Sequence, residues 1–147
     1  MSKLDETIAE FDGLDYQGRL ELLLDFAENL PELPENYRAE RDAGFGRVPE
    51  CMTPVFMWID VADGKVQIVA DVAPEAPTVK GFVALLVDAW NGATAAEVAA
   101  APTDVLRGMG LADKLGMMRL QGLNAIVHRI KAEVARRNTS SQRGSNG

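Results

Sequence analysis

The sequence contains only one cysteine and one histidine among its 147 residues. A single cysteine cannot form an internal disulfide, and these two residues are too few soft ligands for a structural zinc site or an iron-sulfur cluster within one chain. A metal site of that kind would need a second chain. We therefore expect no metal and no bound cofactor here, and any thiol chemistry depends on Cys51.

Long apolar runs and an excess of positive charge are also missing. The longest apolar runs, such as residues 82–87, are far shorter than the ~20 residues of a membrane-spanning helix, and the amino end lacks the basic and apolar regions of a signal peptide. The 22 acidic and 15 basic residues give a net charge of −7, which argues against binding to a phosphate backbone. We expect a cytoplasmic protein that binds neither nucleic acid nor membrane.

The composition is that of one folded domain. Hydrophobic residues make up 47% of the chain and charged residues 25%, as in ordinary globular proteins. We expect a single domain over residues 1–138. The polar residues 139–147 offer little apolar surface to offset the entropy of ordering, so this tail is predicted to be disordered. The oligomeric state is left open, with a homodimer as one alternative.

The hydrophobic patterns predict an α+β fold. Residues 55–61 and 66–72 are rich in β-branched and aromatic side chains, and Asp63-Gly64 between them is a strong hairpin signal. Residues 37–54 lack periodicity and are expected to form an irregular connection. Helical spacing of apolar residues predicts helices over 4–11, 15–30, 79–90, 94–101, 104–109 and 120–134. A small antiparallel sheet would then pack against helices from both ends of the chain.

The helix at 79–90 has the clearest apolar stripe. Val79, Phe82 and Leu86 lie on one helical face and should contact the sheet. Asn91-Gly92 is typical of a left-handed cap at its end. Thr94 through Glu97 matches a capping box, which should start the next helix.

Cys51 lies between Pro49 and Pro54, at the end of the irregular connection. Free cysteines are often buried as small hydrophobic residues. The two prolines stiffen the segment, however, and loops on rigid scaffolds often carry reactive groups, which favours a displayed thiol. A neighbouring cation favours a thiolate, and Arg47 is the nearest candidate, whereas Glu50 would act in the opposite sense. Whether the thiol is activated stays open.

Other patterns give weaker indications of chemistry. His128 falls within the predicted terminal helix without an orienting third residue, so a cysteine-histidine hydrolase pair is disfavoured. Residues 44–46 are too short for a phosphate-binding loop. The methionines are expected to be packing residues rather than metal ligands, although Met117-Met118 would also suit an adaptable contact surface.

Four blocks in order along the chain resemble the SufE family. The resemblance covers about residues 5–137. The four blocks are Leu30-Pro31-Glu32-Leu33-Pro34, Val48-Pro49-Glu50-Cys51, Val79-Lys80-Gly81-Phe82 and Arg119-Leu120-Gln121-Gly122-Leu123. SufE-like proteins accept sulfur from a cysteine desulfurase, which is a pyridoxal-phosphate enzyme, and pass it to the SufB-containing scaffold that assembles iron-sulfur clusters. The resemblance implies the same partners here.

The resemblance also implies roles for individual residues. Cys51 would be the persulfide acceptor. The implied supporting or partner-binding residues are Arg119, Arg47, Glu50, Lys80, Gln121 and Gly122. Many members of the family have glycine before the cysteine and Gln-Ser-Gln-Val-Trp after it, whereas this chain has Glu50 before it and Met52-Thr53-Pro54-Val55-Phe56 after it. The family's usual Ser-Arg-Ser is Met118-Arg119-Leu120, which retains the arginine.

The sequence is compatible with three alternative functions. The first is a sulfur carrier that activates a desulfurase and is not itself a stand-alone enzyme; a lone thiol suits it, because a second thiol would attack the persulfide and release its sulfur. The second is a U-type iron-sulfur scaffold or binding module, which needs several cysteine ligands. The third is a stand-alone thiol enzyme, which lacks a convincing base.

Overall fold

The computed structural model describes residues 2–146, with side chains described as far as residue 139. It confirms the predicted α+β class. Strands β1 (Val55–Ala62) and β2 (Lys65–Val72) form a two-stranded antiparallel sheet, with Val55 opposite Val72 and Ala62 opposite Lys65. The turn between them is at Asp63 and Gly64, which both have positive φ angles of 54° and 75°, as the predicted tight hairpin requires.

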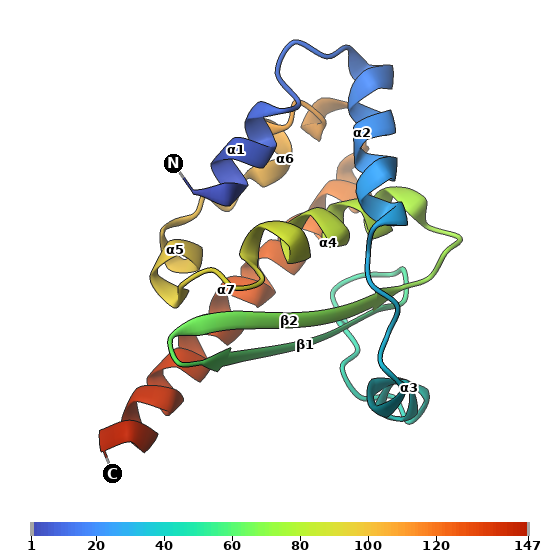
Figure 1. The fold of residues 1–147 in the computed structure, drawn as a ribbon. Coiled ribbons are helices and arrows are strands. Elements are labelled where there is room, and N and C mark those ends of the chain that lie inside the picture. Colours follow the sequence, from blue (N-terminus) through green and yellow to red (C-terminus); the bar gives the residue numbers. More distant parts are fainter. Residues whose placement is uncertain (1, 147) are drawn as a thin grey trace.

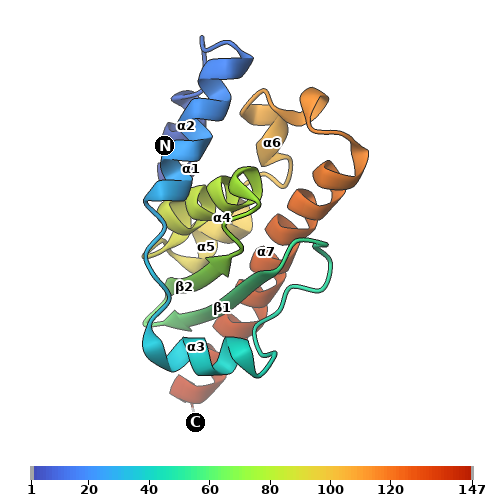
Figure 2. The same cartoon turned by 90° about the vertical axis from the view of Figure 1, so that its right-hand side faces the viewer.

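The inner face of the sheet is buried under two helices. Alternate residues of both strands are buried, as expected for a sheet with one covered face. Helix α4 (Pro77–Trp90) packs on β2 and helix α7 (Met117–Asn146) packs on β1 (Figures 1 and 2). Val79, Phe82 and Leu86 are all buried on α4, which confirms that this stripe is part of the core.

The amino-terminal helices cover the other side of α4 (Figure 1). These are α1 (Lys3–Ala9) and α2 (Tyr16–Glu28). Close approach of α2 to α4 depends on Gly81, because a Cβ there would lie 2.4 Å from the carbonyl oxygen of Leu23. Any larger residue at this position would force the two helices apart.

Short helices connect α4 to α7. They are α5 (Ala95–Ala100), α6 (Val105–Gly108) and the 3₁₀ turn η1 (Ala112–Lys114), which was not predicted. Gly92 has a φ of +86°, which confirms the left-handed cap after α4. The predicted capping box of α5 is half formed, since the Thr94 hydroxyl accepts the amide of Glu97 at 3.1 Å. The chain has a complete capping box at Ser2 and Asp5 instead.

The prediction of an irregular connection over residues 37–54 is wrong for residues 37–42, which are helical. Helix α3 (Glu35–Asp42) forms there without any buried residue, so it has no apolar stripe to reveal it. Tertiary contacts with the outer face of the sheet hold it in place. The rings of Tyr37 and Trp58 lie 5.0 Å apart, and Arg41 donates to Asp71 at 2.9 Å.

Helix α7 is longer than expected. It begins at Met117 rather than Leu120, and the helix bounds extend to Asn146, past the start of the predicted polar tail at 139–147. The side chains from residue 140 on lie outside the described residues, and the disorder of this tail stays a prediction. Among the residues that the structure describes, no helix has the length and apolarity needed to cross a membrane.

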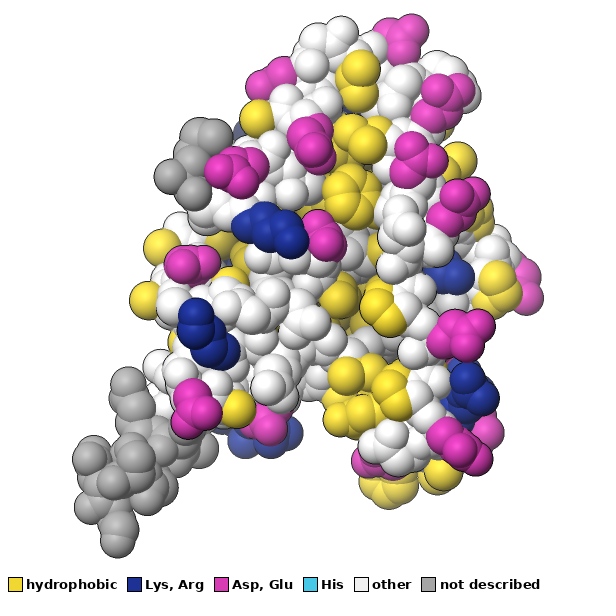
Figure 3. Space-filling view, viewed as in Figure 1, with side chains coloured by type: hydrophobic (Ala, Val, Ile, Leu, Met, Phe, Trp, Pro, Cys, Tyr) yellow, Lys and Arg dark blue, Asp and Glu magenta, His cyan; other side chains and the backbone are white. Residues whose placement is uncertain are grey.

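Charge is distributed unevenly over these elements. The segment of α1 and α2, residues 3–28, contains eight acidic and two basic residues. Acidic side chains accordingly dominate the α1 and α2 end of the face in Figure 3. The part of α7 with described side chains has the opposite sign, with five basic residues and one acidic residue over 117–139.

Candidate functional site

The Cys51 loop is built against the outer edge of β1. The amide of Val48 donates to the carbonyl of Val55 at 2.8 Å, and the amide of Met57 donates to the carbonyl of Gly46 at 2.8 Å. These bonds pair residues 46–48 with the strand and leave residues 49–54 as a short excursion. The excursion returns to the strand at Val55, so Cys51 lies near its tip.

Arg47 stabilises this excursion from within. Its guanidinium donates to the carbonyl of Thr53 at 2.9 Å and to that of Cys51 at 3.4 Å, and it lies 5.9 Å from the centre of the Phe56 ring. The sequence suggested Arg47 as the cation nearest the thiol. In the structure its hydrogen bonds go to backbone carbonyls, so Arg47 shapes the loop.

Cys51 is buried, which corrects the expectation of a displayed thiol. Its exposed fraction is 5%, and it belongs to the hydrophobic core. The thiol lies beside a distant element: a Cβ placed on Gly122 of α7 would lie 3.9 Å from Cys51 Sγ. The loop therefore folds its thiol inward against α7.

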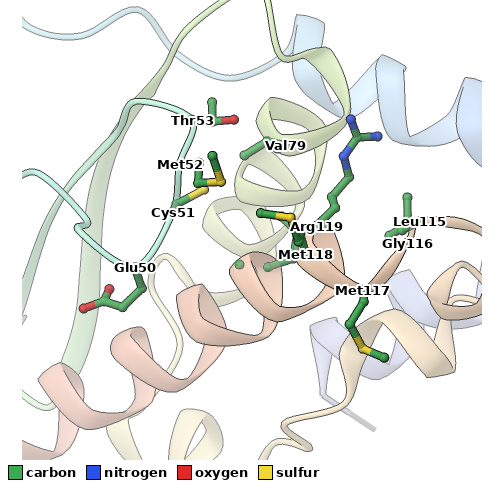
Figure 4. Close-up of a pocket in the computed structure, with 12 residues that line it drawn as sticks. Glu50, Cys51, Met52, Thr53, Val79, Leu115, Gly116, Met117, Met118 and Arg119 are labelled. Atoms are coloured by element: carbon green, nitrogen blue, oxygen red, sulfur yellow. The ribbon is translucent and has the colours of Figure 1, made fainter.

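The thiol lines a pocket of about 620 Å³ between the loop, the start of α4 and the start of α7 (Figure 4). Its walls are largely apolar, with Val79, Leu115 and Leu123 among them, and Cys51 and Arg119 line the same pocket. A thiol in such a place is shielded from bulk water while free space remains in the pocket that it lines.

Three exposed methionines surround the pocket. Met52, Met117 and Met118 have exposed fractions of 82%, 72% and 70% and all line it. We refer to these three residues as the methionine rim. Packing was the expected role of the methionines, and it is correct for Met57 and Met109, which are buried. The three methionines of the rim are exposed, so the expected packing role is wrong for them.

The remaining residues suggested by the sequence are placed differently. Arg119 is exposed and extends away from the Cys51 loop in Figure 4. Gly122 lines the pocket, but neither Lys80 nor Gln121 does: Lys80 is half-buried on α4 and Gln121 is exposed on α7. Of the predicted site residues, the pocket lining thus includes Cys51, Glu50, Arg119 and Gly122, whereas Arg47, Lys80 and Gln121 lie outside it.

Glu50 is paired with a residue that the sequence analysis missed. Its carboxylate accepts a hydrogen bond from the Arg129 guanidinium at 2.7 Å. The two residues are separated by 79 positions, and no local pattern connects them. His128 is exposed and lines a separate depression with Glu50 and Arg129, not the Cys51 pocket. The structure thus gives His128 no place beside the thiol.

Within the described part of the chain, no three histidine, cysteine, aspartate or glutamate residues cluster in a way that could hold a metal ion. The site therefore consists of one thiol, an apolar pocket with one arginine in the pocket lining, and the methionine rim. Such a site can perform nucleophilic chemistry at sulfur and can protect a modified thiol from solvent.

Comparisons with known proteins agree with this arrangement. The family described as "SufE: Fe-S metabolism associated domain" matches residues 5–134. An uncharacterized SufE-like protein of Mycobacterium tuberculosis (strain CDC 1551 / Oshkosh) is 35% identical over 129 residues, which is 87% of this chain and 88% of that protein. The sulfur acceptor protein CsdE of Escherichia coli (strain K12) is 31% identical over 119 residues, or 80% of this chain and 77% of CsdE.

A solved structure shows the same fold. The solution structure of a hypothetical protein from Thermus thermophilus superimposes with a TM-score of 0.78 at 35% identity, covering 95% of this chain and 99% of that one. The chain belongs to the SufE family.

Proposed function

We propose that this protein is a sulfur acceptor that takes persulfide sulfur from a cysteine desulfurase onto Cys51 and passes it on to iron-sulfur cluster assembly. One observation carries the proposal: the chain's only thiol lines an apolar pocket with free space. Membership of the SufE family and similarity to the sulfur acceptor CsdE support it.

The transfer is an exchange at sulfur. The Cys51 thiolate attacks the outer sulfur of the persulfide on the desulfurase cysteine, which forms a new sulfur-sulfur bond on Cys51. The bond between the two sulfurs of the donor breaks, and the desulfurase cysteine leaves as a thiolate that can take up a proton. The sulfane sulfur changes carrier without any external oxidant or reductant. The pyridoxal-phosphate chemistry that first removes sulfur from cysteine belongs to the partner.

The pocket protects the product of this exchange. A persulfide on Cys51 would lie beside apolar walls, where water and other thiols have little access. The chain has no second cysteine that could attack it. With an exposed fraction of 5%, however, the thiol cannot reach a partner's active site as it stands. Transfer therefore requires that residues 49–54 swing outward when the partner docks.

The surface around the pocket supports docking. The methionine rim supplies exposed, adaptable apolar side chains. Arg119 supplies a cation, and α7 behind it carries an excess of positive charge. A partner with an apolar surface bordered by acidic residues would match this face. We place the protein in the cytoplasm, where a reducing environment keeps a lone thiol free.

The two rival functions have less support. An iron-sulfur scaffold needs several ligands, and the described residues offer no cluster of them. A stand-alone thiol enzyme needs a base near its nucleophile, but His128 lies outside the pocket lining. Delivery of the sulfur to a SufB-containing scaffold follows from the family resemblance alone and is part of the proposal.

Desulfurase kinetics test the proposal. When the protein is added to a cognate desulfurase and cysteine without a reductant, desulfurase turnover should rise by about one turnover per added protein, because Cys51 accepts one sulfur and nothing present discharges it. The Cys51→Ser variant should not stimulate it, because a hydroxyl cannot carry a transferable sulfur. The same variant should compete with the wild type for the desulfurase, since its docking surface is intact. Equal stimulation by the serine variant would refute the carrier mechanism.

A further inference from the structure

The Cys51 loop is fastened to α7 by one ion pair. Arg129 Nη1 donates to Glu50 Oε1 at 2.7 Å, and both side chains are about two-fifths exposed, at 42% and 39%. Glu50 immediately precedes Cys51. A constraint on Glu50 is therefore transmitted through a single peptide unit to the residue that carries the thiol.

The other hydrogen bonds of residues 49–54 run to nearby segments; at the end of the excursion, the Ala73 amide donates to the Pro54 carbonyl at 3.3 Å. The Cys51 amide donates to the Val48 carbonyl, and Arg47 donates to the carbonyls of Cys51 and Thr53, so these bonds are internal. Within the described part of the chain, the Glu50–Arg129 pair is the one hydrogen bond from residues 49–53 to an element outside the loop. Outward movement of Cys51 must break this pair, together with the apolar contacts in the pocket and the hydrogen bonds that Arg47 and Val48 make with the loop.

We propose that the Glu50–Arg129 pair is a latch that holds the Cys51 loop closed, so that Arg129 is a positioning residue that sets how often the thiol becomes accessible. The proposal rests on the proposed function for its purpose, because the latch keeps the sulfur acceptor sheltered between transfers. A half-exposed ion pair is weak, and this weakness suits a latch, because a docking partner can break the pair at little cost.

Thiol alkylation distinguishes a latch from a simple electrostatic effect. Neutralising Glu50 removes a negative charge next to the thiol, whereas neutralising Arg129 removes a positive one. Through electrostatics alone the two changes would shift the thiolate population in opposite directions. A latch predicts that both changes act in the same direction, because each one opens the same link.

The experiment measures the rate of Cys51 alkylation by iodoacetamide at about pH 10, where an ordinary cysteine thiol is ionised. Glu50→Gln and Arg129→Gln should each be alkylated about two- to fivefold faster than the wild type, as expected for loss of an exposed pair. The charge-reversed double variant Glu50→Arg/Arg129→Glu should return toward the wild-type rate. High salt weakens exposed ion pairs, so at about 1 M salt the wild-type rate should rise toward that of the single variants.

A matched control lies on the same helix. Arg137 pairs with Glu133 at 3.1 Å and lines neither of the two depressions that Glu50 lines, so Arg137→Gln should leave the alkylation rate unchanged. Thermal unfolding of each variant shows whether its fold is intact. Unchanged rates in both single variants, rates that move in opposite directions, or failure of the double variant to restore the rate would each overturn the latch.

Failure of the latch is separable from failure of the sulfur-acceptor function. Alkylation needs no partner, so the latch can be tested even if no desulfurase transfers sulfur to Cys51. Conversely, a wild-type protein that gains sulfur from a desulfurase supports the proposed function whatever the alkylation rates show.

Discussion

Gly122 of α7 lies beside the thiol of Cys51, and a Cβ placed there would be 3.9 Å from Sγ. That distance is ordinary van der Waals contact, so a methyl group fits beside Sγ without displacing it. The small residue at this position leaves the space into which a second sulfur atom on Cys51 could extend. The pocket thus borders a glycine within a helix, where glycine is otherwise unfavourable.

Substitutions at Gly122 test this relationship. Gly122→Ala should raise the free energy of unfolding by about 0.5–1 kcal/mol, because alanine is the better helix former, and leave Cys51 alkylation nearly unchanged. Gly122→Leu should fill the space beside Sγ, push the loop outward and speed alkylation. Urea unfolding and iodoacetamide kinetics measure both quantities. Identical alkylation of the leucine and alanine variants would show that Gly122 does not define the space around the thiol.

Arg119 is predicted to act at the partner interface. Its side chain extends away from the Cys51 loop (Figure 4), so Arg119→Ala should leave the alkylation rate of the free protein unchanged. Binding to a desulfurase should weaken about two- to fivefold, as for an exposed charge pair, and the difference should disappear at high salt. If binding is unaffected at low salt, Arg119 is an ordinary solvated side chain.

The methionine rim is predicted to be buried by the partner. Met118→Asp should retain the thermal stability of the wild type, since Met118 is exposed, but should weaken desulfurase binding about tenfold or more because a charge would enter an apolar contact. Phe45→Asp is a suitable control, because Phe45 is exposed outside the Cys51 pocket. Comparable binding by the two variants would count against the rim as a docking surface.

Lys131 is predicted to be important for stability. Its amine donates to the carbonyls of Val98 and Ala99 at 2.9 and 3.0 Å, and also to that of Ala101, which joins the end of α5 to α7. Burial lowers the pKa of the Lys131 amine, so replacement removes a desolvation cost as well as these bonds. Lys131→Met should lose about 1–2 kcal/mol in urea unfolding.

A control for this loss is the exposed Arg136 on the same helix. Arg136→Gln should change the free energy of unfolding by less than about 0.5 kcal/mol, because surface ion pairs contribute little. If Lys131→Met were as stable as this control, the three carbonyl contacts would have no net effect on stability.

Much of the fold could be predicted because its signals are local. The strands alternate in burial, Asp63-Gly64 marks the hairpin turn, and the stripe from Val79 to Leu86 marks the core face of α4. Helix α3 could not be found in this way. It buries no residue and is held by partners on the sheet, such as Asp71 for Arg41, so its sequence carries no apolar period.

The candidate site was predictable in its central residue and not in its surroundings. Cys51 is the only thiol, and its place in the family pattern identified it. Burial places its thiol beside Gly122, which lies far along the chain, and proline-flanked loops give no sign of such a contact. The Glu50–Arg129 pair likewise arises only when the loop meets α7. Contacts such as these join residues that are far apart in the sequence, so they exist only in the folded chain.

Intact mass spectrometry shows directly whether Cys51 accepts a sulfur atom from a partner desulfurase. The protein is incubated with a cognate desulfurase and cysteine, quenched and weighed, alongside samples lacking either component and the Cys51→Ser variant. We expect a gain of one sulfur atom in the complete wild-type reaction alone, and its loss on treatment with a reductant. No gain in that reaction, or an equal gain in the serine variant, would contradict it.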